Sequence, residues 1–253
     1  MTLPQPSPAE IGKYYQTPDY VSHSETTQGI VNKLYHLVRK KNTKDKLKLI
    51  TSFSSGCRNL LDVGCGTGYF LSFCKENGWN IEGVEVNDVA RSTAETRTGQ
   101  LIYPSTEAME ASGRKFDVIT LWHVFEHLHD VQSSFARLKR LLNPAGWLIM
   151  ALPNPLSPDA AYYNEYWAAY DVPRHLSHFS PVSVRILAEK YGLRSETPVP
   201  MKFDAYYVSI LSEELKGREK ISALLHGLWQ GYHSNRLARQ TENYSSLIYV
   251  MRL

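Results

Sequence analysis

Short apolar stretches alternate with helical patterns through the middle of the chain. The apolar stretches are rich in β-branched residues and have the length of buried strands; they occupy positions 59–63, 80–86, 101–103, 116–121 and 147–151. Helical spacing of apolar residues lies between them, at 69–77, 88–98 and 131–142. Strands that alternate with helices in this order predict an α/β fold with a mostly parallel sheet and helices on both faces.

The segments on either side of this core also have apolar residues at helical or strand spacing. Apolar positions within residues 28–50 predict one or two amphipathic helices, so we expect residues 1–55 to form an N-terminal segment and helical cap, and residues 56–253 to form the main domain. Beyond the core we expect a helix at 181–191, strands at 193–199 and 246–251, and a polar helical insertion at 212–240.

Composition narrows the classes of protein to which this chain could belong. The 253 residues include 28 Lys and Arg against 25 Asp and Glu, a formal charge of +3 that is too small to indicate nucleic-acid binding. The N-terminus lacks the basic and apolar parts of a signal peptide, and no apolar stretch is long enough to span a bilayer. The three cysteines have no metal-site spacing. We therefore expect a cytoplasmic protein with reduced thiols, and the oligomeric state stays open.

A glycine-rich turn follows the first predicted strand. Gly64, Gly66 and Gly68 come directly after Leu60-Leu61-Asp62-Val63, and a helical pattern begins at Tyr69. Glycine permits positive φ and a close approach of the backbone to a ligand, and the start of a helix presents N–H groups. The pattern predicts a cofactor site at this turn.

Two acidic residues end neighbouring predicted strands. Asp62 ends the first strand, and Glu85 lies at the end of the second. An acid in the second position can accept both ribose hydroxyls of an adenosine cofactor, as it does in dinucleotide folds. A cofactor that contains adenosine is therefore expected.

These segments together resemble the class I S-adenosylmethionine-dependent methyltransferases. The resemblance rests on Leu61-Asp62-Val63-Gly64-Cys65-Gly66-Thr67-Gly68, Gly83-Val84-Glu85, Phe116-Asp117-Val118-Ile119 and Leu142-Asn143-Pro144-Ala145-Gly146-Trp147-Leu148. It implies a Rossmann-like seven-stranded sheet with an antiparallel last hairpin, and S-adenosylmethionine as the cofactor. NAD is the competing cofactor, but Tyr69 stands where the dinucleotide motif has its third spaced glycine.

The resemblance also implies which residues hold the cofactor. Glu85 would hold the ribose, and Val86 would pack on the adenine. The methionine part would face Asp62 and the turn residues Gly64, Cys65, Gly66 and Gly68. Pro104-Ser105-Thr106 replaces the usual acid after the third strand. The adenine amino group would therefore be bound by Ser105, by Thr106 or by the backbone.

A histidine–glutamate cluster follows the fourth predicted strand, at the sheet edge where α/β folds bind ligands. If a helical turn begins there, His123, Glu126 and His127 share one face and could supply a general base or bind a divalent metal. The Glu126-His127 pair is similar to a segment of the ubiquinone-biosynthesis-type O-methyltransferases that is associated with magnesium. An acid usually takes the place of His123 in that group, so no metal is predicted here. We expect His123 to contact the cofactor or the acceptor, and the competing interpretation is a structural cluster.

Residues 154–180 predict a lid over the acceptor. The segment follows the fifth strand and is too rich in aromatic residues for a disordered loop. Tyr166 and Trp167 are expected to line an apolar acceptor pocket, and Arg174 to hold an anionic acceptor through its guanidinium. The alternative is that Arg174 pairs with Asp171 and braces the lid.

An oxygen acceptor must lose a proton during methyl transfer, and a neutral histidine can take it. His175 is the first candidate for this base, followed by His178 and His127; capping of the next helix is the alternative role of His178. The N-terminal residues Tyr14, Tyr20 and His23 have a similar aromatic and polar texture and are expected to complete the acceptor pocket, with surface packing as the alternative.

The function predicted from the sequence is methyl transfer from S-adenosylmethionine to a small or medium-sized acceptor, at oxygen. Transfer to nitrogen or carbon is the first alternative. The Asn/Asp-Pro-Pro-Tyr/Phe motif of many N-methyltransferases is replaced here by Leu121-Trp122-His123-Val124. A non-catalytic module that keeps the fold and the cofactor is the second alternative.

Overall fold

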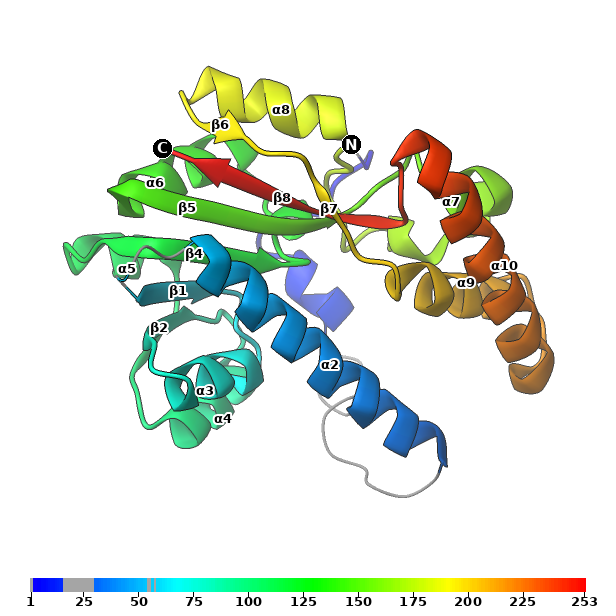
Figure 1. Ribbon diagram of the computed structural model, residues 1–253, viewed down its shortest axis with the longest axis horizontal. Coiled ribbons are helices and arrows are strands. Elements are labelled where there is room, and N and C mark those ends of the chain that lie inside the picture. Colours follow the sequence, from blue (N-terminus) through cyan, green and yellow to red (C-terminus); the bar gives the residue numbers. More distant parts are fainter. Residues whose placement is uncertain (1, 16–29, 54–55, 57) are drawn as a thin grey trace. The chain divides into compact units, whose positions relative to one another are not determined.

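The computed structural model describes residues 2–15, 30–53, 56 and 58–253, with the side chains of the first long helix described from residue 39 onward. Within these residues, eight strands form one sheet in the order β3-β2-β1-β4-β5-β8-β6, and β7 pairs with β8 (Figure 1). The chain divides into two compact units. We call them the N-terminal unit (Pro6–Leu121 and Gln132–Leu148) and the C-terminal unit (Met1–Gln5, Trp122–Val131 and Ile149–Leu253).

The strands of the N-terminal unit are parallel. They are β1 (Asn59–Val63), β2 (Asn80–Val84), β3 (Ile102–Tyr103) and β4 (Phe116–Trp122), the last of which ends in the C-terminal unit. β1 lies between β2 and β4, with Leu60 opposite Ile81 on one side and Val118 on the other. Both neighbours are reached through crossover helices, so β1 ends at the switch point where such sheets bind ligands.

The helices of the N-terminal unit are η1 (Ile11–Tyr15), α2 (Ile30–Phe53), α3 (Tyr69–Glu76), α4 (Asp88–Thr98), α5 (Thr106–Ala111) and α6 (Val131–Leu141). They include three, α3, α4 and α5, that contact these strands. α3 lies beside β2 and α4 (Figure 1). The core includes Leu61, Leu71 and Ile119, none of which is exposed. Residues 28–50 were expected to form one or two helices, and the described part is one helix.

The strands of the C-terminal unit include the antiparallel pairing that was expected at the end of the chain. β5 (Leu142–Pro153) begins in the N-terminal unit and ends here, followed by β6 (Arg194–Ser195), β7 (Val199–Pro200) and β8 (Ser246–Arg252). β6 and β7 both pair antiparallel with β8. The single strand predicted at 193–199 is wrong in this detail. Pro198 has no N–H for the ladder, so the segment forms two short strands and the sheet has eight strands rather than seven.

Helices make up most of the rest of the C-terminal unit. They are η2 (Phe125–His127), α7 (Pro158–Tyr163), η3 (Asn164–Tyr166), η4 (Ala168–Tyr170), α8 (Pro181–Lys190), α9 (Asp204–Leu215) and α10 (Lys220–Thr241). The helical insertion predicted at 212–240 is wrong in its extent, since helix begins at Asp204 and divides into α9 and α10 around Gly217. α7, α9 and α10 contact one another (Figure 1).

The predicted fold class is confirmed: the chain has a Rossmann-like, mostly parallel sheet flanked by helices. Among the described residues, no helix is both long and apolar enough to cross a membrane. The predicted boundary between a cap of residues 1–55 and a domain of residues 56–253 stays a prediction.

Candidate cofactor site and histidine cluster

The glycine turn of the N-terminal unit is built by backbone conformations that glycine favours. Gly64, Gly66 and Gly68 have φ of 70°, 55° and 73°, in the left-handed region. The turn is fixed to the next strand because the N–H groups of Gly64 and Cys65 both donate to the carbonyl oxygen of Val84, at 2.7 and 3.0 Å. The turn is therefore held at the end of β2, beside the residue that follows that strand.

That next residue is Glu85, whose carboxylate links the turn to the start of α4. Its Oε2 accepts a hydrogen bond from the N–H of Gly66, and its Oε1 accepts one from the N–H of Asn87, each at 2.9 Å. The side chain is only 3% exposed. Each carboxylate oxygen has two acceptor sites, so each can still accept one ribose hydroxyl. The carboxylate is thus held in place before any ligand binds.

The space around the turn fits an adenosine cofactor. A Cβ added at Gly66 would meet no atom within 4 Å, whereas one added at Gly68 would lie 2.9 Å from the Ala94 side chain. The turn is therefore packed against α4 on one side and open at Gly66. Val86 directly follows Glu85 and is 76% exposed, so its side chain is accessible for contact with a planar base.

Asp62 lies buried at the end of β1. Thr120 of β4 donates a hydrogen bond of 2.6 Å to its Oδ1. Burial raises the pKa of Asp62 to about 7, and the nearby carboxylate of Glu85 adds to this, while the Thr120 hydrogen bond and the charge of Lys46 oppose it. A positive charge on a nearby ligand would lower the pKa of Asp62. Binding of a cationic ligand would therefore release the proton of this carboxyl group.

The other predicted cofactor residues of this unit have packing or hydrogen-bonding roles within the protein. Cys65 is 8% exposed, and burial raises the pKa of its thiol, so it is a packing residue of the turn in its neutral form. Thr106 begins α5 and accepts a hydrogen bond of 3.3 Å from Arg137. Ser105 caps the same helix through the N–H of Ala108. Their contact with adenine stays a prediction.

In the C-terminal unit, His123 lies between two carboxyl groups. Its Nε2 is 3.2 Å from Asp204 Oδ2 on α9, and its Nδ1 is 3.5 Å from Glu126 Oε1. Burial opposes protonation, but the two carboxylates outweigh it and raise the pKa of His123 to about 9. The backbone of His123 has a φ of 57° and lies outside η2, so the expected continuous helical turn does not form. Its contact with cofactor or acceptor stays a prediction, and its described partners give it a positive charge.

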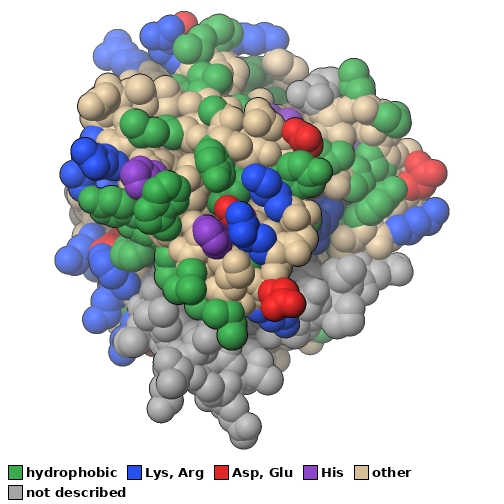
Figure 2. Space-filling view, turned by 90° about the vertical axis from the view of Figure 1, so that its right-hand side faces the viewer, with side chains coloured by type: hydrophobic (Ala, Val, Ile, Leu, Met, Phe, Trp, Pro, Cys, Tyr) green, Lys and Arg blue, Asp and Glu red, His purple; other side chains and the backbone are tan. Residues whose placement is uncertain are grey.

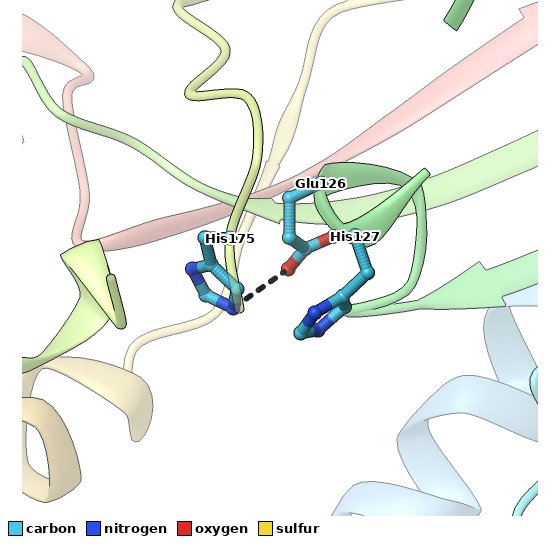
Figure 3. A group of neighbouring side chains, drawn as sticks. All are labelled: Glu126, His127 and His175. Atoms are coloured by element: carbon cyan, nitrogen blue, oxygen red, sulfur yellow. Dashed lines mark ion pairs between the residues drawn. The ribbon is translucent and has the colours of Figure 1, made fainter. Parts of the chain in front are cut away.

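Glu126 is at the centre of the histidine cluster, which we define as Glu126, His127 and His175 (Figure 3). The carboxylate is 1% exposed, and neither oxygen accepts a hydrogen bond from the described residues. Burial opposes its ionisation, but the neighbouring His123 outweighs burial and, with smaller contributions from the other two histidines, holds the pKa of Glu126 below its ordinary value. One potential ligand atom from each residue of the cluster lies within 4.8 Å of the others. Two imidazoles and a carboxylate form a donor set that suits a divalent metal.

Backbone carbonyls fix the orientation of both imidazoles. His175 Nδ1 lies 2.9 Å from the carbonyl oxygen of Ala169, and His127 Nδ1 lies 3.1 Å from that of Arg174. A carbonyl only accepts, so Nδ1 carries the proton in each neutral ring. His175 Nε2 then has the lone pair, 3.9 Å from Glu126 Oε1 and 3.7 Å from Asp171 Oδ2. Burial lowers the pKa of His175 to about 4, with His127 adding and the two carboxylates opposing, so the ring is neutral at pH 7.

The lid residues have different surroundings. Trp167 is 1% exposed and donates its indole N–H to Asp159 at 2.8 Å, which favours a structural role, whereas Tyr166 is exposed. Arg174 forms an ion pair of 2.5 Å with Asp171, the bracing contact that was the alternative interpretation.

The remaining predicted residues belong to the chain's N-terminal part and to the end of the lid. His178 lies 3.4 Å from Thr2 Oγ1, while Ser180 caps α8. Tyr14 is exposed in η1 of the N-terminal unit. Tyr20 and His23 lie outside the described residues.

Three residues with direct contacts to these groups were not predicted from the sequence. Asn87 supplies the second N–H to Glu85, Thr120 hydrogen-bonds to Asp62, and Asp204 pairs with His123. Thr120 lies within a recognisable strand and could have been found from the pairing of β1 with β4. Asp204 is distant in the sequence, and no local pattern links it to His123.

The chain is similar to known methyltransferases. It matches the family described as "Methyltransferase domain" over residues 25–197. It is 29% identical over 103 residues to a ubiquinone biosynthesis O-methyltransferase of Coxiella burnetii, covering 38% of this chain and 44% of that protein. It is 24% identical over 160 residues to the protein of that name from Nitrosospira multiformis, covering 58% and 67%. The matched part is thus about half the length of the Coxiella relative.

The fold is similar to that of solved methyltransferases. The magnesium protoporphyrin IX methyltransferase of Synechocystis PCC 6803, solved with bound S-adenosylhomocysteine, superposes with a TM-score of 0.58 at 11% identity, covering 95% of this chain and 91% of that one. This similarity concerns the fold alone. The family match spans most of the chain and includes the glycine turn, Glu85 and the Glu126-His127 pair. The chain therefore belongs to the methyltransferase-domain family.

Proposed function

We propose that this protein transfers a methyl group from S-adenosylmethionine to an oxygen atom of a small or medium-sized acceptor. The observation that carries the proposal is the open glycine turn next to the fixed carboxylate of Glu85. Membership of the methyltransferase-domain family supports it. The relatives named as O-methyltransferases support oxygen as the accepting atom.

The bound cofactor supplies an electrophilic methyl group on a positively charged sulfur. In the proposed complex Glu85 accepts the ribose hydroxyls, and Val86 covers one face of the adenine. Gly66 leaves room for the ligand at the turn. Asp62 ionises when the positive charge arrives, because that charge offsets the burial that holds its pKa near 7.

His175 is the proposed base that takes the proton of the acceptor hydroxyl. His175 Nε2 would accept the proton that the acceptor hydroxyl loses when its oxygen forms a bond to the methyl carbon and the carbon–sulfur bond of the donor breaks. The Nδ1 contact to Ala169 supports this role because it places the lone pair on Nε2. The carboxylates of Glu126 and Asp171 would stabilise the imidazolium that results. Arg174, Tyr166 and His178 stay proposed contacts of the acceptor, and the proposed site needs no metal.

We also propose that the protein acts in the cytoplasm on a small molecule rather than on nucleic acid. The two described cysteines, Cys65 and Cys74, are free and buried, which is typical of proteins in a reducing compartment.

The oxygen assignment is tested with S-adenosylmethionine labelled in its methyl group. The protein is incubated with a pool of phenols and catechols, and separately with a matched pool of aromatic and aliphatic amines. Label is expected in the hydroxyl pool. Transfer confined to the amine pool would contradict the proposed accepting atom while leaving the cofactor assignment intact.

The base is tested with His175→Ala, using the best acceptor from that screen. A general base contributes roughly 10²–10⁴-fold, so the turnover number should fall by that factor. His226→Ala changes an exposed histidine of α10 and serves as the matched control. If His175→Ala keeps the wild-type turnover number and pH–rate profile, another residue is the base.

A further inference from the structure

Helix α10 buries its small residues and exposes its large apolar ones, the reverse of the usual arrangement in a surface helix. The face that is buried against its own unit carries small or uncharged polar residues: Ala223, Gly227, Gln230, Gly231, Ser234, Asn235 and Ala238. A Cβ added at Gly227 would lie 2.5 Å from the Cα of Ile210, and one at Gly231 would lie 2.7 Å from the Cα of Tyr206. The two helices α9 and α10 therefore pack closely through small residues, and the large apolar residues of α10 point elsewhere.

Those large residues form a stripe along the outside of α10. Each of its members is between 40% and 77% exposed: Ile221, Leu224, Leu225, Leu228, Trp229 and Tyr232. Their spacing of three and four residues places them on one helix face. Monomeric proteins rarely expose contiguous apolar surface of this kind, and where they do it usually marks an interaction site. We call this set the α10 stripe.

The charges of α10 are all positive. Within Lys220–Thr241 the charged residues are Lys220, Arg236 and Arg239, and the helix contains no Asp or Glu. Arg236 and Arg239 follow Tyr232 by four and seven positions, so they lie on the same helix face as the α10 stripe. Both are exposed, and they give the C-terminal end of this face a positive charge. Acidic residues occur only beside the helix ends, at Glu219 and Glu242. Figure 2, which views this side of the molecule, shows exposed hydrophobic side chains next to Lys and Arg side chains.

We propose that the α10 stripe is a docking surface for an anionic lipid membrane, on which α10 lies parallel to the surface. Exposed leucines with Trp and Tyr on one face and cationic residues at its end are the features of an interfacial helix. Arg236 and Arg239 would contact lipid phosphates while the α10 stripe enters the boundary between headgroups and acyl chains. This inference goes beyond the proposed function and does not depend on it.

A second copy of the chain fits the same face less well. In a parallel arrangement of two α10 helices, Arg236 and Arg239 would meet their own counterparts. In an antiparallel arrangement they would meet Lys220. Both arrangements bring like charges together without an acidic residue on either helix to compensate them. An anionic surface complements these charges and needs no matching groove.

Sedimentation with vesicles tests the proposal on the full chain. We expect the wild type to pellet with vesicles of equal parts phosphatidylglycerol and phosphatidylcholine, but not with phosphatidylcholine alone. Removing two exposed apolar side chains of the α10 stripe in L225S/W229S should weaken vesicle binding by roughly tenfold or more. The charge variant R236Q/R239Q changes only exposed residues, so its fold should be intact, and its binding should also fall and lose most of its salt dependence.

The matched control is V182S/I186S, which removes two apolar side chains that are similarly exposed on α8. It should bind vesicles as the wild type does, and circular dichroism should be the same for all variants. Absence of wild-type binding to the anionic vesicles would overturn the proposal, as would equal binding by all three variants. A wild-type dimer that becomes monomeric in L225S/W229S would also overturn it, in favour of a second copy.

Discussion

Substitution of Glu85 by alanine perturbs the part of the site on which the cofactor assignment depends. In the wild type its carboxylate accepts the N–H groups of Gly66 and Asn87, and it is almost completely buried. Alanine removes both acceptors at once. The N–H groups of Gly66 and Asn87 have then lost their hydrogen-bond acceptor in the protein.

The size of the effect follows from these contacts. Leaving a buried donor unsatisfied costs about 1–3 kcal/mol, so two such donors should lower the free energy of unfolding by roughly 2–6 kcal/mol. Cofactor affinity should fall further, because the ribose hydroxyls also lose their charged acceptor. Hydrogen bonds to a charged group contribute about 1.5–3 kcal/mol each, so losing two of them should raise Kd by roughly 10² to 10⁴-fold.

Two assays separate these effects. Urea unfolding measures stability without cofactor, and equilibrium dialysis with labelled S-adenosylmethionine measures Kd at a temperature where both proteins are folded. Glu85→Gln keeps the size but turns an amide NH₂ toward one of the two N–H donors, so its Kd should lie between those of the wild type and Glu85→Ala. Glu76→Ala, an exposed position on α3, is the control. A Kd for Glu85→Ala within threefold of the wild-type value would refute the ribose role.

Two further predictions concern the same unit. Because the pKa of Asp62 is raised to about 7 in the folded protein, from an ordinary value of 3.8, the folded state binds its proton more tightly than the unfolded state does. Stability of the cofactor-free protein should therefore fall as pH rises from about 4 to 7, by at most about 4 kcal/mol, and urea unfolding of Asp62→Asn should lack this slope. In Gly83→Ala the new Cβ would lie 2.7 Å from Leu71 Cδ1 and 3.0 Å from Cys65 Sγ, so we expect a loss of about 1–3 kcal/mol in the free energy of unfolding. Gly12→Ala, whose Cβ would meet nothing within 4 Å, should unfold at the wild-type urea concentration, and equal values for the two variants would contradict the packing argument.

The cofactor side of the fold could be predicted from the sequence because its signals are local. A buried strand, a glycine turn and a helix follow one another without interruption, and Glu85 directly follows the next strand. β5 extends well beyond the predicted 147–151, and α5 was not predicted at all. Six residues capped by Ser105 give too short a periodic pattern to stand out.

The C-terminal unit was less predictable because its contacts are distant in the sequence. His123 pairs with Asp204 across a long segment, and the tautomer of His175 depends on a backbone carbonyl that no side-chain pattern reveals. Residues 212–240 were predicted only as a polar helical insertion, with no buried face assigned to it. The small polar residues of α10 are instead buried, because only small residues allow α9 and α10 to approach closely. The four-residue spacing of Gly227 and Gly231 was the signal that could have indicated this.

Calorimetric titration of the wild-type chain tests the central claim most directly. The open glycine turn and the carboxylate of Glu85 predict saturable binding of S-adenosylmethionine at one site per chain, with a proton released near pH 7 as Asp62 ionises. NAD should give no comparable heat under the same conditions. Absence of heat with S-adenosylmethionine and with S-adenosylhomocysteine, or tighter binding of NAD, would contradict the assignment of this turn as the methyl-donor site.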